Sequence, residues 1–315
     1  MKVKELFNET KTKLGIREAE QLITEILGKD RVYIYAHGED EVEDIENIQK
    51  AIERRLNGEP LQYILKSASF MGIKMYVDDR VLIPRPETEL LCEEAKRAVL
   101  LASAPVDPEK CRFCLQKGNC DSKDGRETIS ILDICTGSGA IAAYIAAEFP
   151  KAQITASDIS SDALAVTEVN LRRIIGGEEA PELNPTFFGY SKILKLRNRF
   201  ISLVQSDLFE NISGQFDLIT ANPPYIPSET VLTLDPVVRD HEPHLALDGG
   251  KDGFELPMRL IKDSISHLKP DGTLLMEIGD DQGGKALEAA ANSGFRSCRI
   301  IKDYAGQDRI LAASL

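Results

Sequence analysis

The chain contains 315 residues, 43% hydrophobic and 28% charged, which is close to the globular average, so a packed core is expected and global disorder is excluded. Its net charge of −13 argues against direct nucleic-acid binding, because that affinity depends mostly on basic contacts to phosphates. The acidity favours a basic protein partner or a small molecule. The densest basic segment, which we interpret as a solvated loop, carries Lys192, Lys195, Arg197 and Arg199.

The sequence contains no apolar run long enough to cross a bilayer, and residues 1–20 lack the apolar segment of a signal peptide. We therefore expect a cytoplasmic protein without a membrane partner. The 6 cysteines are too few and too unevenly spaced for a secreted disulfide framework. Cys111, Cys114 and Cys120 could contribute to a metal site, but structural zinc usually needs four ligands, so we predict no metal.

Residues 1–66 are predicted to form a small helical bundle. Apolar residues recur at helical spacing between Ile16 and Ile26 and again between Ile45 and Leu56, and Gly28 and Gly58 are plausible helix ends. A bundle of this size is suited to recognising a partner.

Residues 67–84 are predicted to be a hairpin that links the bundle to a larger domain over residues 85–315. The stretches from Ser69 to Tyr76 and from Arg80 to Ile83 resemble two strands, with Asp78-Asp79 as the turn between them.

The larger domain begins with a predicted helix from Glu87 to Leu101, and two stretches, at about 103–128 and 176–200, resemble insertions. From residue 129 onward strands and helices alternate, which predicts an α/β fold with a mainly parallel sheet and helices on both faces. The predicted strands are Ile129–Ile134, Gln153–Ser157, Ile201–Gln205, Phe216–Ala221, Thr273–Ile278, Cys298–Lys302 and Arg309–Ala313. The predicted helices among them are Ala140–Phe149, Ser161–Ile174, Phe254–Leu268 and Gln282–Ser293.

Ligands of open α/β sheets bind at the carboxyl ends of the strands, so the residues that follow each strand are candidates for a site. Two glycines after the first strand allow a sharp turn and a close approach of the backbone to a ligand, next to the start of a helix. A glycine-rich turn without a ligand would have the same pattern. The residues of this turn are Cys135, Thr136, Gly137, Ser138 and Gly139.

Acidic residues follow the next two strands. Asp158 could accept hydrogen bonds from both hydroxyls of an adenosine ribose. The alternative is a helix cap, but Ser160 and Ser161 lie closer to the helix start. Asp207 could accept from an adenine amino group while Leu208 packs on the ring, although an Asp in a turn is equally plausible.

The most informative segment is Asn222-Pro223-Pro224-Tyr225, which directly follows the fourth strand. The two prolines restrict the backbone and remove two donors, so that carbonyl groups are left to accept. Asn222 adds a side-chain carbonyl. A rigid set of acceptors after a buried strand is suited to binding a planar NH2 group.

These motifs together resemble those of class I S-adenosylmethionine-dependent methyltransferases that act on amino groups. More closely, the chain resembles the peptide chain release factor glutamine methyltransferases, the PrmC/HemK family. Asn-Pro-Pro-Tyr also occurs in adenine methyltransferases, but the helical front domain and the run from Ile83 to Glu89 are typical of this family. The remaining segments of the resemblance are Gly58-Glu59-Pro60, Tyr63-Ile64, Val81-Leu82, Glu242-Pro243, Ala246-Leu247, Gly249-Gly250, Asp252-Gly253, Glu277-Ile278-Gly279 and Asp308-Arg309.

The resemblance implies an N-terminal helical bundle joined by a hairpin to a Rossmann-like, seven-stranded methyltransferase sheet. It implies methyl transfer from S-adenosylmethionine to N5 of the glutamine in the Gly-Gly-Gln motif of class 1 release factors. The residues implied to hold the cofactor are Cys135, Thr136, Gly137, Ser138, Gly139, Asp158, Asp207, Leu208 and Asn222. The residues implied to hold the glutamine amide are Asn222, Pro223, Pro224 and Tyr225, with Asn222, Pro223 and Tyr225 closest to the methyl transfer.

Other functions remain possible from the sequence. Glutamine methylation of a ribosomal protein and adenine N6 methylation of a nucleic acid share Asn-Pro-Pro-Tyr, although the acidity argues against the second. A nicotinamide-dependent oxidoreductase fits the glycines and Asp158 loosely, but this class gives no reason for Asn222-Pro223-Pro224-Tyr225. A non-catalytic scaffold would not need these acceptors.

Overall fold

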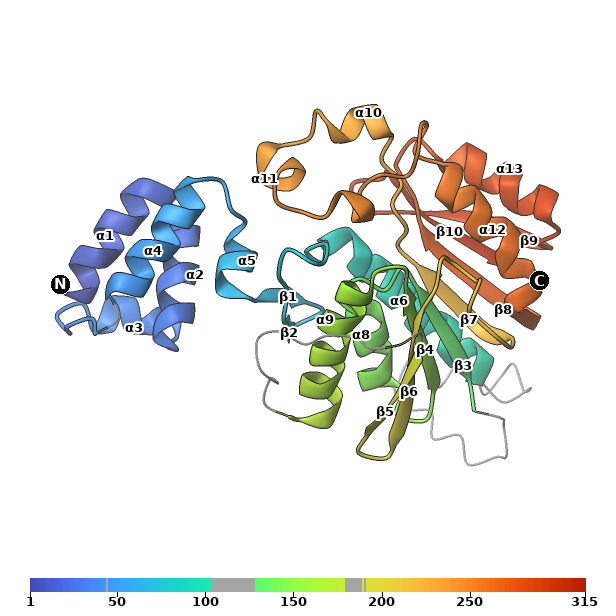
Figure 1. Cartoon of the computed structure of the whole chain (residues 1–315), viewed down its shortest axis with the longest axis horizontal. Helices are drawn as coiled ribbons and strands as arrows, with labels where there is room; N and C mark the ends of the chain where they lie inside the picture. The colour runs from blue at the N-terminus through green and yellow to red at the C-terminus, as the bar shows by residue number, and fades with distance from the viewer. Residues whose placement is uncertain (44, 104–127, 179–188, 190) are drawn as a thin grey trace.

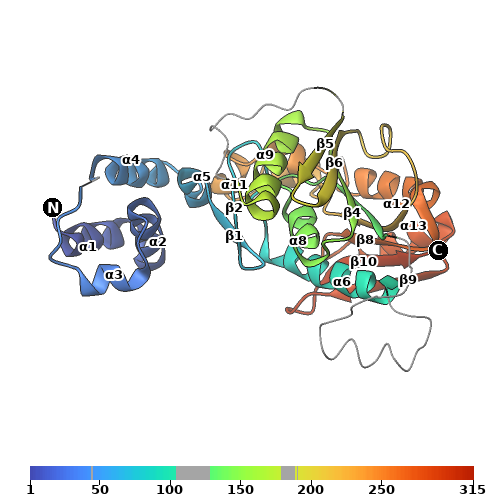
Figure 2. The same cartoon turned by 90° about the horizontal axis from the view of Figure 1, so that it is seen from below.

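The computed structural model describes residues 1–43, 45–103, 128–178, 189 and 191–315. A group of short helices at the N-terminal end lies to one side of a larger part built around a sheet (Figure 1, Figure 2). None of the helices in these residues combines the length and the hydropathy needed to cross a membrane. Cys111, Cys114 and Cys120 lie outside the described residues, so their role stays a prediction.

The N-terminal bundle forms because its helices are amphipathic and bury one face each. Val3, Leu6, Leu22, Ile23 and Ile48 are fully or almost fully buried in a shared core. The helices are α1 (Val3–Leu14), α2 (Ile16–Leu27), α3 (Arg31–Ala36), α4 (Ile45–Leu56) and α5 (Leu61–Leu65). The predicted helical character of this region is confirmed.

Helix α5 connects the bundle to the sheet. Leu61 packs in the bundle core, whereas Tyr63 packs in the core of the larger part. The buried hydroxyl of Tyr63 donates to the carbonyl oxygen of Val81 at 2.5 Å. The helix therefore contributes to both cores, although the exact division of the chain into domains at residues 66 and 84 stays a prediction.

The linker contains a hairpin, but not where the sequence predicted it. The strands are β1 (Ala68–Phe70) and β2 (Ile73–Met75), so the turn lies at Met71-Gly72, where both residues have positive φ. A turn does form at Asp78-Asp79, where Val81 N donates to the Asp78 carbonyl at 3.1 Å, but it does not join two strands, so the predicted hairpin there was wrong. The buried Asp78 carboxylate accepts from the guanidinium of Arg80 and the hydroxyl of Tyr76, and residues 80–83 form no strand.

The larger part is organised around one sheet with the strand order β5-β6-β4-β3-β7-β8-β10-β9. The five strands β6, β4, β3, β7 and β8 are parallel to one another, and antiparallel strands complete both edges. The strands are β3 (Ser130–Ile134), β4 (Gln153–Asp158), β5 (Ser191–Leu196), β6 (Arg199–Gln205), β7 (Phe216–Ala221), β8 (Leu268–Glu277), β9 (Ser297–Lys302) and β10 (Asp308–Ser314).

Helices cover both faces of this sheet because the central strands are apolar on both sides. Ile131 of β3 packs beneath α6 (Pro86–Ser103), α8 (Ala140–Glu148) and α9 (Ser161–Leu171). Leu132 and Ile134 of the same strand pack on the opposite face with α12 (Glu255–His267) and α13 (Gly283–Ser293). A π-helical turn, η1 (Arg172–Gly176), extends α9. Short elements lie between β7 and α12: α10 (Ser228–Val231), α11 (Pro236–Arg239) and η2 (His244–Ala246).

Each of the seven predicted strands corresponds to a strand of the sheet, and β5 is an eighth that the sequence analysis missed. The basic segment is therefore not a solvated loop but the hairpin β5–β6. Leu194 and Leu196 of β5 are buried while Ile193 and Lys195 are exposed, which is the alternation of an edge strand. The lysines hid this pattern, and Arg197 supplies the positive φ for the turn.

Candidate active site

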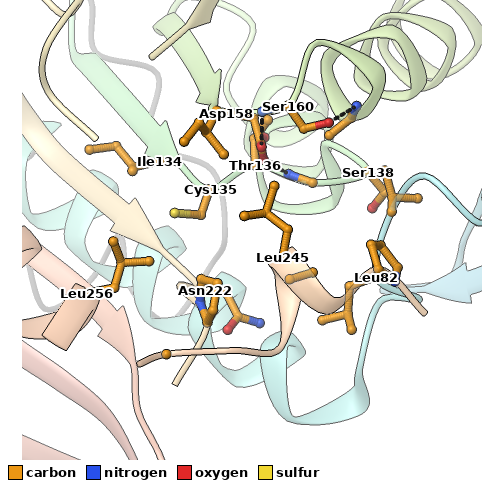
Figure 3. Close-up of a pocket in the computed structure, with 18 of the residues that line it drawn as sticks. Leu82, Ile134, Cys135, Thr136, Ser138, Asp158, Ser160, Asn222, Leu245 and Leu256 are labelled. Carbon is orange, nitrogen blue, oxygen red and sulfur yellow. Dashed lines mark hydrogen bonds between the residues drawn. The ribbon is translucent and has the colours of Figure 1, made fainter. Parts of the chain in front are cut away.

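A cavity of about 380 Å³ opens where β3, β4, β6 and β7 end, which is a volume typical of small-ligand sites (Figure 3). Residues of the linker, including Leu82, line it opposite the strand ends. Figure 3 shows Asp158, Cys135, Asn222 and Leu245 around this space. The topology thus brings the predicted polar residues together at one edge of the sheet.

The glycine-rich turn after β3 is held in a compact shape. Cys135, Gly137 and Gly139 all have positive φ, and Gly139 precedes the first residue of α8. Thr167 of α9 donates to the carbonyl of Gly137 at 2.9 Å. A Cβ on Gly137 would meet nothing within 4 Å, so the backbone at Gly137 is open to the cavity that it lines.

Asp158 fixes the other side of this turn. Its carboxylate accepts from the backbone N–H of Gly137 at 2.9 Å and of Ser160 at 3.0 Å, one bond to each oxygen. Burial raises the pKa of Asp158, and these backbone donors partly offset that effect. The cap of α9 is Ser160, whose hydroxyl accepts from Ala163 N, so the reasoning that Asp158 is not the cap is confirmed.

A second acidic group, Asp133, lies buried beneath the turn. Its carboxylate accepts from the hydroxyls of Thr136 at 2.6 Å and Thr220 at 2.8 Å. Burial raises the pKa of Asp133 to about 6 despite these donors. The contacts join β3, the turn and β7, so Asp133 supports the site without lining the cavity.

Asp207 and Leu208 lie after β6 on the cavity wall. Arg259 Nη2 of α12 forms an ion pair with Asp207 Oδ1 at 3.2 Å. Leu208 is buried and has a positive φ of 47°. Its apolar side chain beside an acceptor is the arrangement expected for a flat heteroaromatic ring with an amino group.

The segment Asn222-Pro223-Pro224-Tyr225 is packed tightly against neighbouring residues. Gly249 lies so close that a Cβ there would be 2.7 Å from Tyr225 Cα and 2.8 Å from the Pro224 carbonyl oxygen. Gln282 Nε2 donates to the carbonyl of Tyr225 at 2.9 Å. Together with the two prolines, these contacts hold the segment rigidly.

Two residues outside the predicted site hold the polar groups of this segment. Thr88, in the first turn of α6, accepts from Asn222 Nδ2 at 3.0 Å and donates to Glu277 Oε2 at 2.8 Å. Tyr225 donates to Glu277 Oε1 at 3.0 Å. Burial raises the pKa of Glu277, and the carboxyl is only 1% exposed. Burial, followed by the charge of Glu277, raises the pKa of Tyr225, which keeps its phenol protonated.

Most of the predicted site residues line the cavity, but Gly139, Pro223 and Tyr225 are not among its lining residues. Besides Thr88 and Glu277, the sequence analysis missed Asn170. Its amide donates to the carbonyls of Tyr76 and Ser138 and accepts from Tyr76 N, which ties the linker to the glycine-rich turn. Glu277 carried a detectable signal, since it is a charged residue ending a buried strand. Thr88 falls in the run from Ile83 to Glu89 that carries the resemblance, but nothing in the sequence assigned it a role at the site, and Asn170, within a helix, carried no signal.

Comparison with known proteins shows similarity to methyltransferases along almost the whole chain. A family model described as the PrmC N-terminal domain matches residues 2–65. The release factor glutamine methyltransferase of Thermodesulfovibrio yellowstonii is 33% identical over 312 residues, which cover 98% of this chain and 95% of that protein. The one of Rhodopirellula baltica is 34% identical over 300 residues, which cover 94% and 88%. The hMettl16 catalytic domain, solved with a MAT2A 3′UTR hairpin, has a TM-score of 0.50 at 12% identity over 85% of this chain and 80% of that chain, a likeness of fold alone.

The fold and these relatives define a methyltransferase with a Rossmann-like sheet and an N-terminal helical bundle. The predicted fold class is confirmed, with one strand more than the seven expected. The chain belongs to the release factor glutamine methyltransferase family, as the sequence motifs indicated.

Proposed function

We propose that this protein transfers a methyl group from S-adenosylmethionine to N5 of the glutamine in the Gly-Gly-Gln motif of class 1 peptide chain release factors. The observation that carries the proposal is the position of Asn222, a rigidly held amide acceptor at the same cavity as the glycine-rich turn and Asp158. Full-length relatives named for this activity support the choice of substrate.

The residues of the cavity fit the proposed cofactor. Each oxygen of Asp158 uses one lone pair on a backbone N–H, so further lone pairs remain for the two hydroxyls of a ribose. Gly137 leaves room for a close approach of the ligand to the backbone. Asp207 and Leu208 are suited to an adenine, and Cys135, Thr136 and Ser138 complete this wall. When bound, S-adenosylmethionine supplies a methyl group on a positively charged sulfur.

The protein's contribution to the reaction is to orient and polarise an unreactive nucleophile. An amide nitrogen is a poor nucleophile because its lone pair is delocalised into the carbonyl. The Asn222 side-chain oxygen and the Pro223 carbonyl are proposed to accept the two N–H groups of the substrate amide, which increases electron density on nitrogen and fixes its direction. The nitrogen loses its proton after it has gained the methyl group, so no strong base is needed. Pro224 would form the adjoining wall, with Tyr225 supporting it through Glu277.

The helical bundle is proposed to contact the release factor, since it lies apart from the sheet and does not contribute to the cavity lining (Figure 1). The release factor would then contact residues 1–66 with a second part of its surface, while its glutamine enters the cavity.

The test is a labelling experiment with purified protein, methyl-labelled S-adenosylmethionine and a class 1 release factor. The matched control is the same release factor with the glutamine of its Gly-Gly-Gln motif changed to alanine. Label on the first and none on the second is expected. Label on neither, while the protein still binds the cofactor, would refute the proposed substrate. A ribosomal protein fraction and adenine-containing nucleic acid, tested in parallel, would then reveal which alternative accepts the methyl group.

A further inference from the structure

A chain of hydrogen bonds connects three distant segments at the edge of the cavity. Glu277 ends β8, Thr88 lies in the first turn of α6, and Asn222 follows β7. The Thr88 hydroxyl donates to Glu277 Oε2 at 2.8 Å and accepts from Asn222 Nδ2 at 3.0 Å. Thr88 and Asn222 line the cavity, whereas Glu277 lies behind them and is 1% exposed.

The donors and acceptors in this series of hydrogen bonds are fixed. A hydroxyl has one proton, and the proton of Thr88 is used by the buried carboxylate of Glu277. The Thr88 oxygen can therefore only accept from its other neighbour, so the NH2 side of the Asn222 amide must face it. Turning the amide over would bring two acceptors together or take the proton away from the buried carboxylate, and both are unfavourable.

The fixed orientation leaves the side-chain oxygen of Asn222 free to accept a hydrogen bond. With Nδ2 held by Thr88, the Oδ1 atom of Asn222 points away from Thr88, and no hydrogen bond to it comes from another residue in the described part of the chain. Glu277 is itself held in place by the second donor, the hydroxyl of Tyr225. An oriented acceptor at the cavity is the group that an amide N–H of the substrate requires.

We propose that Thr88 is a positioning residue for methyl transfer: through its hydroxyl, Glu277 sets which end of the Asn222 amide faces the substrate. This inference rests on the proposed function, because it gives Asn222 Oδ1 the task of accepting from the glutamine N–H. Thr88 itself holds neither the cofactor nor the methyl group.

The experiment compares Thr88→Val, which has a similar shape but no hydroxyl, with Thr88→Ser, which keeps the hydroxyl. For Thr88→Val we expect kcat on the release factor to fall by about 10- to 100-fold, as for misplacement of a catalytic group. The KM for release factor and the dissociation constant for S-adenosylmethionine should change by less than about twofold, since Val occupies the same space. Thr88→Ser should restore most of kcat. A Thr88→Val enzyme with wild-type kcat, or a Thr88→Ser enzyme as slow as Thr88→Val, would overturn the proposal.

A second measurement does not depend on the substrate. The side-chain NH2 of Asn222, assigned in NMR spectra by comparison with Asn222→Ala, should exchange its hydrogens with solvent more slowly in the wild type and Thr88→Ser than in Thr88→Val. Equal exchange in all three proteins would overturn the proposal even if release factors were not the substrate. Should Thr88→Val fail to fold, Glu277→Gln replaces it. The new amide can donate to Thr88, reverse the hydroxyl and turn Asn222 over, and the same loss of kcat is expected.

Discussion

Replacing Gly139 with alanine is expected to destabilise the protein by about 1–5 kcal/mol, from two destabilising effects and a smaller stabilising one. Gly139 has a φ of 76°, a left-handed conformation that costs an L-residue about 1–2 kcal/mol. The new Cβ would also lie 2.7 Å from Thr167 Cγ2 and 3.2 Å from Thr167 Cα. Overpacking of this kind typically costs about 1–3 kcal/mol. Alanine also lowers the conformational entropy of the unfolded chain, which stabilises the folded state by about 0.4–1 kcal/mol.

Gly137 is the matched control for this substitution. Its φ of 55° is also left-handed, but a Cβ there would meet nothing within 4 Å. Gly137→Ala should therefore show the backbone effect alone, about 1 kcal/mol. Since Gly137 lines the cavity, the added methyl group should instead weaken the binding of S-adenosylmethionine. Urea unfolding of each variant, compared at equal m-value, gives the two free-energy differences.

Thr167→Ser isolates the clash. It removes Cγ2 and keeps the hydroxyl that donates to the Gly137 carbonyl. In the double variant Gly139→Ala/Thr167→Ser, we expect at least about 1 kcal/mol of the loss to be recovered, although Thr167 Cα still lies close. Equal destabilisation by Gly137→Ala and Gly139→Ala, or no recovery in the double variant, would refute the reasoning.

Three further outcomes are expected. Asn222→Ala should fold normally, as judged by its thermal unfolding, but lose about 100-fold or more in kcat; full turnover would contradict the role of its amide. Burial raises the pKa of Asp133 from 3.8 to about 6, so the folded state binds this proton more tightly than the unfolded state. The stability from this group is fully present below about pH 4 and is lost as the pH rises through 6, so the wild type should lose up to about 3 kcal/mol relative to Asp133→Asn between pH 4 and pH 7 in denaturant unfolding. A difference that does not vary with pH would refute this. Ser157 Oγ is buried without a hydrogen-bond partner among the described residues, so Ser157→Ala should leave the free energy of unfolding unchanged or raise it by about 1 kcal/mol. Thr220→Val, which removes a donor to Asp133, should lower it by about 1–3 kcal/mol, and equal losses in the two variants would show that Ser157 has an unseen partner.

The sequence predicted the fold best where periodicity and strand-end chemistry agreed. The parallel strands β3, β4, β6 and β7 are short apolar runs that each end in a polar segment, so both their existence and their ligand edge could be inferred. The edge strand β5 was missed because its two lysines fall on both faces of the strand and its exposed face carries Ile193, so the sequence shows no clear alternation. The hairpin was placed wrongly because Asp78-Asp79 has a turn composition and does form a turn, whereas the turn that joins the two strands lies at Met71-Gly72.

The candidate site could be predicted only in part for a related reason. Residues that contact a ligand from strand ends can be read from the order of strands, because parallel strands end at one edge. The residues that orient them come from other parts of the fold. Thr88 lies 134 positions from Asn222 and Asn170 lies 94 positions from Tyr76, and nothing local in the sequence indicates either contact.

These long-range contacts explain physically why the linker belongs to the site. Asn170 binds the backbone of Tyr76 and of Ser138, so the linker and the glycine-rich turn are held by one buried amide. Glu242 accepts from Ile83 N and from Arg85, which fastens the other end of the linker beside the cavity. Because α6 begins directly after this segment, the position of Thr88 depends on the linker. Helix α5, whose Leu61 and Tyr63 pack in the two cores, leads into this linker, so one continuous segment joins the helical bundle to the start of α6.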